Sequence, residues 1–71
     1  MIKDLAFQVS NGNNVSSHDM ANVMDEILNG TQNDQDVANF LKNLARKGES
    51  DDELLAMLNK MEEFAIHISQ N

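Results

Sequence analysis

Few residues of this chain could do metal, acid–base or nucleophilic chemistry, and their spacing weighs against all three. Neither of the two histidines, His18 and His67, is followed by a second ligand at i+3 or i+4, a spacing at which two side chains share one helix face. The absence of cysteine excludes disulfides, thiolate metal sites and thiol catalysis. No serine lies in a Gly-x-Ser-x-Gly context, and no glycine-rich phosphate loop is present. We therefore expect no catalytic, cofactor-binding or metal-binding residue in this sequence.

An acidic cluster is the remaining candidate site, and it comprises Glu49, Asp51, Asp52 and Glu53. A calcium loop needs regularly spaced oxygen ligands around a central glycine, and no register of this segment supplies them. Helix capping explains the cluster better, because Ser50 can accept from the backbone of Glu53 while the Glu53 carboxylate reaches back to the Ser50 N–H. Arg46 and Lys47 suit the last turn of a preceding helix, and Gly48 suits the left-handed conformation that ends one. The segment predicts a helix stop followed at once by a helix start.

Four segments with a helical period of apolar residues account for most of the chain. The first predicted helix covers about residues 2–10, and the second starts after Ser16 or Ser17 as its cap and runs through Leu28. The third follows the cap Asn33 and ends at Lys47, and the fourth covers about residues 51–68. The last helix carries a long stripe of leucine, methionine and phenylalanine, so we expect it to contribute the most core. Because the connections are short, successive helices must be neighbours. The sequence predicts one all-α domain over residues 1–71, a small bundle of four helices.

Composition narrows the classes of partner. Twelve acidic and five basic residues give a net charge of −7, which repels nucleic-acid backbones. No stretch approaches the length of a membrane span, and the start lacks the apolar run of a secretory signal, so we expect a cytoplasmic protein.

The five methionines are interpreted as core filling rather than as an adaptable peptide-binding surface. A chain of 71 residues is near the lower size limit for a stable core, which favours a partner or a missing continuation.

Three stretches carry a family resemblance: Ile27-Leu28-Asn29-Gly30, then Asp34-Gln35-Asp36-Val37-Ala38-Asn39-Phe40-Leu41, and then Lys47-Gly48-Glu49-Ser50 with Glu53-Leu54. Together they resemble the N-terminal helical domain of anthranilate phosphoribosyltransferase, and the resemblance covers nearly the whole chain. Met57 and Met61 fit the long methionine-containing helix that follows in that family. Asn39 and Met20 depart from the pattern, because a small apolar residue and an alanine are common there.

The resemblance implies an enzyme that transfers phosphoribose from phosphoribosyl pyrophosphate to anthranilate, with magnesium, in tryptophan biosynthesis. It also implies that the phosphate-binding loop and the metal-binding acidic residues belong to an α/β catalytic domain that is absent here. We therefore expect this chain alone to be inert. Two alternatives stay open: the related helical domain of a pyrimidine nucleoside phosphorylase, whose third corner resembles Gly-Met instead, and a free-standing helical interaction module.

The family's helical domain forms one wall of the interdomain cleft and mediates homodimerisation, completed by helices from later in the chain. The resemblance therefore implies two partners, the α/β catalytic domain of the parent chain and a second copy. The candidate partner-facing residues lie on the first and third predicted helices and are Ile2, Leu5, Ala6, Val9, Phe40 and Leu44. An intramolecular core is the alternative role for the same six residues.

Overall fold

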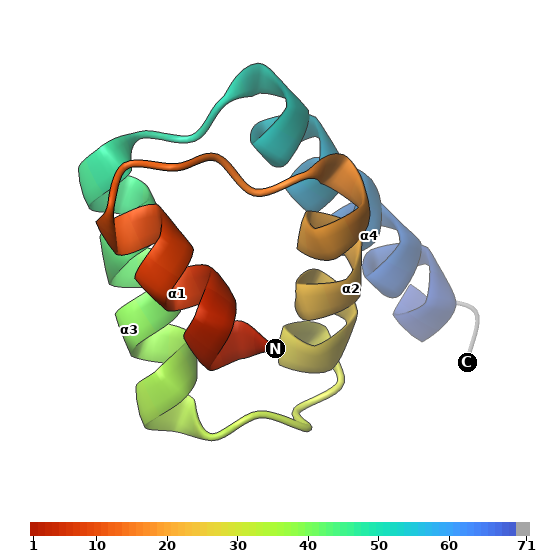
Figure 1. The fold of residues 1–71 in the computed structure, drawn as a ribbon. Helices are drawn as coiled ribbons and strands as arrows, with labels where there is room; N and C mark the ends of the chain where they lie inside the picture. The colour runs from red at the N-terminus through yellow and green to blue at the C-terminus, as the bar shows by residue number, and fades with distance from the viewer. Residues whose placement is uncertain (70–71) are drawn as a thin grey trace.

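The computed structural model consists of four helices joined by loops (Figure 1). They are α1 (Ile2–Ser10), α2 (Ser17–Leu28), α3 (Asp34–Lys47) and α4 (Asp51–Ser69). The structure describes residues 1–69, and their side chains as far as residue 66. No strand occurs among these residues, so the predicted all-α bundle of four helices is confirmed, with helix bounds that agree to within a residue.

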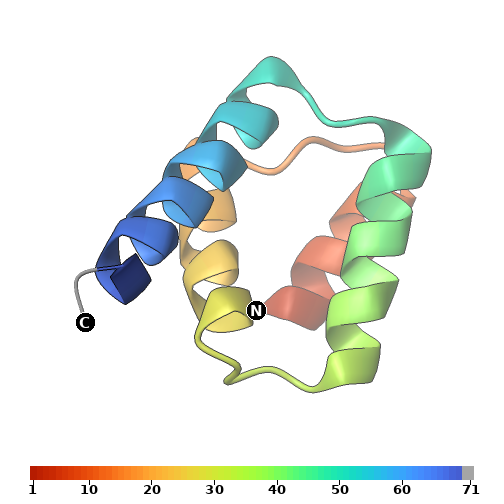
Figure 2. The same cartoon turned by 180° about the vertical axis from the view of Figure 1, so that it is seen from behind.

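The helices form two pairs. α1 packs against α3, and α2 packs against α4, so the expectation that successive helices are neighbours is wrong for the main packing contacts. Within each pair the two helices run in the same general direction, whereas the two pairs run in opposite directions (Figures 1 and 2). Two of the three connections, residues 11–16 and 48–50, therefore cross from one pair to the other at the same end of the bundle.

The core is built chiefly by α1, α2 and α3. Its buried members are Ile2, Leu5, Ala6, Val9, Val15, Met20, Val23, Met24, Phe40, Leu44 and Ala56, of which only the last belongs to α4. All six candidate partner-facing residues are in this set, where the intramolecular alternative predicts them. The homodimer itself stays a prediction.

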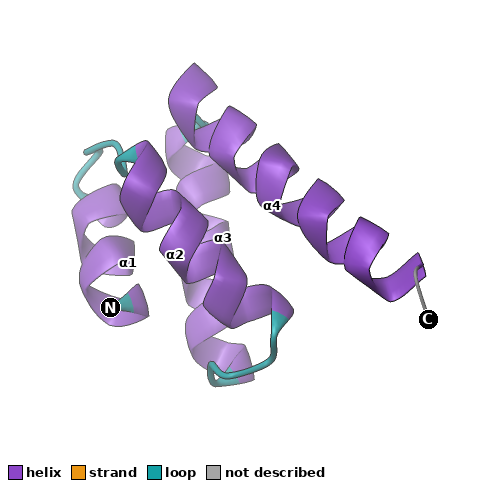
Figure 3. Ribbon diagram, turned by 90° about the vertical axis from the view of Figure 1, so that its right-hand side faces the viewer, coloured by secondary structure: helices purple, strands orange, loops and turns teal. Residues whose placement is uncertain are grey.

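The expectation that the last helix contributes the most core is wrong. α4 packs against α2 through one narrow face, and its C-terminal part extends away from the other helices (Figure 3). Because the buried residues of α4, Glu53 and Ala56, lie on that face, the apolar stripe beside it stays outside the core. Five large side chains of α4 are between 46% and 59% exposed, namely Leu54, Leu55, Leu58, Met61 and Ile66.

Local capping explains where α2 and α3 begin. The Ser16 hydroxyl accepts from the Asp19 N–H at 3.1 Å, and the Asn33 side chain accepts from the N–H groups of Gln35 and Asp36 at 2.8 and 3.3 Å. Both predicted caps are confirmed. Gly48 has the expected positive φ of 88°, but its ψ of 129° lies outside the left-handed helical region. This extended ψ carries the chain away from α3 and directly into the start of α4.

Candidate functional site

A buried carboxylate lies at the corner between α3 and α4. Glu53, in the first turn of α4, has no exposed surface. Its Oε1 accepts from the Ser50 N–H at 2.7 Å, and the Ser50 hydroxyl accepts from the Glu53 N–H at 3.1 Å. The predicted capping box is therefore confirmed. Its Oε2 accepts from the Val15 N–H at 2.6 Å, a contact to the loop before α2 that sequence reasoning missed.

Lys47 supplies the compensating charge. Its ammonium group donates to Glu53 Oε1 and to Asn14 Oδ1, both at 2.8 Å, and to the Gly48 carbonyl at 2.9 Å. These three bonds use all the donors that an ammonium group has. The charge also stands at the C-terminal end of α3, and that of Glu53 at the N-terminal end of α4, where each is favoured by the helix dipole.

Electrostatics keep the Glu53 carboxyl group ionised. Burial raises its pKa, but the hydrogen bonds from the Lys47 ammonium and from the N–H groups of Ser50 and Val15 lower it, and the net result is a pKa below the ordinary glutamate value. General acid or base chemistry at neutral pH requires a group that exchanges its proton and reaches a substrate. A shielded, ionised carboxylate does neither, so we assign Glu53 a structural role.

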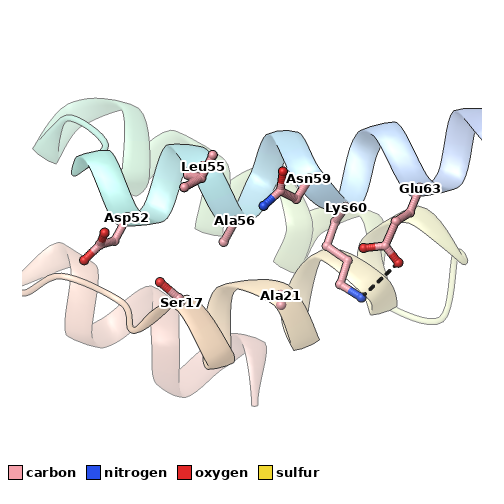
Figure 4. A pocket seen from close by; sticks show the side chains of 8 residues that line it. All are labelled: Ser17, Ala21, Asp52, Leu55, Ala56, Asn59, Lys60 and Glu63. Carbon is pink, nitrogen blue, oxygen red and sulfur yellow. Dashed lines mark ion pairs between the residues drawn. The ribbon is translucent and has the colours of Figure 1, made fainter.

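A groove of about 370 Å³ runs between α2 and α4 (Figure 4). Its floor contains the small side chains of Ala21 and Ala56, and Leu55 stands at its edge. Asp52 lies toward one end of the groove and Lys60 toward the other, so these two charged groups are kept apart (Figure 4). Lys60 is instead paired with Asp25 at 3.2 Å and Glu63 at 3.6 Å, and its pKa is raised chiefly by the hydrogen bond to Asp25. The groove suits packing of an apolar side chain rather than catalysis.

Metal binding finds no support in the geometry. Within the part of the chain that the structure describes, no three histidine or acidic side chains form a group that could hold a metal ion. His18 is exposed and its Nε2 lies 3.2 Å from Nδ2 of Asn22, while the side chain of His67 is outside the described residues. None of the described helices is both long and apolar enough to cross a membrane.

Two helix pairs joined by a buried polar corner define a small all-α helical bundle domain. The chain belongs to the glycosyl transferase family as its helical bundle domain, because the profile of that domain matches residues 3–65. The chain is also 44% identical over 68 residues to anthranilate phosphoribosyltransferase of Nitrosopumilus maritimus (strain SCM1), which confirms the resemblance seen in the sequence. That match covers 96% of this chain and 20% of the relative, so the chain spans about a fifth of the relative's length. No solved structure matches it.

Proposed function

We propose that this chain is the N-terminal helical domain of a cytoplasmic anthranilate phosphoribosyltransferase of tryptophan biosynthesis. The observation that carries the proposal is the identity of 44% to an enzyme of that name over 96% of the chain. The resemblance implies transfer of phosphoribose from phosphoribosyl pyrophosphate to anthranilate. Because the match covers only 20% of the relative, the remaining length can accommodate a separate catalytic domain.

In this proposal the chain contributes structure, and the α/β domain of the parent enzyme contributes the chemistry. The buried Glu53 is committed to capping and to Lys47, so its carboxylate is not available to a substrate. Magnesium, which the resemblance implies for the parent enzyme, finds no donor set among the described residues and is assigned to the α/β domain. The chain alone is inert.

The exposed face of α4 is the surface that we assign to the rest of the parent enzyme. Leu54, Leu58 and Met61 follow each other at intervals of four and three residues, so they form one stripe along the helix. Each is about half exposed, at 46%, 52% and 48%. An exposed apolar stripe of this kind is typical of a surface that another element covers.

The second partner is another copy of the domain, which we place on α1 and α3. The residues first considered for this contact are buried within one chain, so exposed side chains of the same helices must make it. Phe7 of α1 is 71% exposed and lines a shallow groove between α1 and α3, together with Asn39 and Asn43. Sedimentation of the chain at high concentration tests this contact, and a strict monomer would count against it.

A chimeric enzyme tests the assignment of function. This chain replaces the matching segment of the Nitrosopumilus maritimus enzyme, and turnover of phosphoribosyl pyrophosphate with anthranilate is measured. We expect the chimera to be active, and both the isolated chain and the relative without its helical domain to be inactive. A folded chimera without activity would contradict the proposal. Turnover by the isolated chain would contradict the assignment of the chemistry to the α/β domain.

A further inference from the structure

Lys47 and Glu53 connect the two helix pairs through hydrogen bonds. The strength of a hydrogen bond depends on the angle at which donor and acceptor meet. We propose that these residues are positioning residues: their network with Asn14 and Val15 sets the angle between the α1/α3 pair and the α2/α4 pair. That angle decides where the exposed face of α4 points. The inference stands on the geometry of the isolated chain and does not depend on the proposed function.

The network joins the loop before α2 to the corner between α3 and α4, and the bonded residues are 33 and 38 positions apart in sequence. Glu53 of α4 binds the backbone of Val15 at 2.6 Å, and Lys47 of α3 binds the side chain of Asn14 at 2.8 Å. The bond of 2.8 Å between Lys47 and Glu53 then ties the two contacts to each other. Both connections that cross between the pairs at this end of the bundle (Figure 1) are thus held together by one polar cluster around the buried Glu53.

Other contacts between the pairs constrain the angle less. Apolar burial is not directional, and methionines such as Met20 and Met24 adapt to altered packing. Among the described side chains of α4, Ala56 joins the buried core and Met57 packs against it partly buried. Charge-assisted hydrogen bonds, in contrast, weaken steeply when their geometry changes. The polar network is therefore the part of the molecule that can select one angle.

Two variants weaken the network with little change in shape. Glu53→Gln retains an oxygen that can accept from Ser50 and Lys47, but it turns an NH₂ group toward the Val15 N–H, so two donors face each other. Lys47→Met keeps the aliphatic stem and removes the ammonium group. Ser50→Ala is the matched control, because it removes the hydroxyl that caps the Glu53 N–H and leaves every bond of the carboxylate in place.

Distances between spin labels report the angle. The chain has no cysteine, so labels can be attached only at introduced ones. A label pair at Lys42→Cys of α3 and Glu62→Cys of α4 spans the two helix pairs, and a pair at Asp4→Cys and Lys42→Cys lies within one; all three sites are exposed. We expect Glu53→Gln and Lys47→Met to shift or broaden the first distance distribution only, and Ser50→Ala to change neither.

Three results would overturn the inference. A wild-type distribution between α3 and α4 in folded Glu53→Gln and Lys47→Met would mean that the network contributes stability alone. An equal change in Ser50→Ala would mean that any loss of capping loosens the bundle. A change within the α1/α3 pair would mean general unfolding. Circular dichroism establishes folding of each variant, and Glu53→Gln decides the matter if Lys47→Met does not fold, since it keeps an oxygen that can accept from Ser50 and Lys47.

Discussion

The Lys47 ammonium nitrogen lies 2.8 Å from Oε1 of Glu53, and the two side chains are 8% and 0% exposed. Removing two charges from water is costly, and their attraction repays that cost only when further hydrogen bonds satisfy both groups. Here Val15, Ser50, Asn14 and the Gly48 carbonyl provide those bonds. We therefore expect the contribution of the pair to the free energy of unfolding to become measurable mainly when one partner is removed.

We expect Lys47→Met to lower the free energy of unfolding by about 3–5 kcal/mol, because it leaves a buried carboxylate without its counter-charge. Glu53→Gln should cost about 1–3 kcal/mol through the unsatisfied donor at Val15. The double variant should cost less than the sum of the two, as measured by urea denaturation in a double-mutant cycle. Additive losses would show that the two groups do not interact.

Lys60→Met is the control for this cycle. In the wild type, Lys60 pairs with Asp25 and Glu63 on the surface, where ion pairs contribute little to stability because water and salt screen them. We expect no measurable change in the urea midpoint for this variant. A loss as large as that of Lys47→Met would mean that burial is not what distinguishes the two lysines.

Acid should destabilise the domain through Glu53. Burial raises the pKa of this carboxyl group, but hydrogen bonds from Lys47, Ser50 and Val15 outweigh it, so the pKa in the folded chain is below that in the unfolded chain. Its stabilising contribution is then complete above the ordinary glutamate pKa of about 4.3, and is lost as the pH falls toward the folded pKa. Urea midpoints measured from about pH 6 to about pH 3 should fall less steeply for Glu53→Gln than for the wild type. Equal slopes would assign the acid sensitivity to other carboxylates.

The bounds of the helices could be predicted from sequence because the signals that set them are local. Ser16 and Asn33 each bind N–H groups two or three residues ahead, and Gly48 follows the last turn of α3 directly. The capping box of Ser50 and Glu53 spans three residues as well. Such contacts can be read without knowing the rest of the fold.

The buried face of α4 and the second role of Glu53 could not be predicted in this way. Val15 is 38 residues from Glu53 in sequence, so only the folded chain brings them together. The leucines and methionines of α4 have the period of a core helix, but the periodicity does not tell which side α2 covers. Sequence reasoning therefore placed the helix correctly and misjudged its burial.

Gly48→Ala should be destabilising for backbone reasons alone. A Cβ atom at this position would meet no atom within 4 Å, so no steric clash contributes. The φ of 88° and ψ of 129° are sparsely populated by residues with a side chain, and the strain is expected to cost about 1–3 kcal/mol. Glu49→Ala, next to it and exposed, should change the free energy of unfolding by less than about 0.5 kcal/mol. Equal urea midpoints for the two variants would contradict the expected backbone strain at position 48.

Substitution of Leu44 should have the same effect in the isolated chain and in the chimeric enzyme, whereas substitution of Leu58 should matter only in the chimera. Leu44 is 1% exposed, so Leu44→Ala should cost about 2–5 kcal/mol in either protein. Leu58 is 52% exposed, so Leu58→Gln, which keeps a good helix former, should change the isolated chain by less than about 0.5 kcal/mol. In the chimera the same substitution places an amide in a covered apolar contact, and we expect lower thermal stability and lower turnover. If Leu58→Gln is neutral in both proteins, the rest of the enzyme does not cover this face of α4.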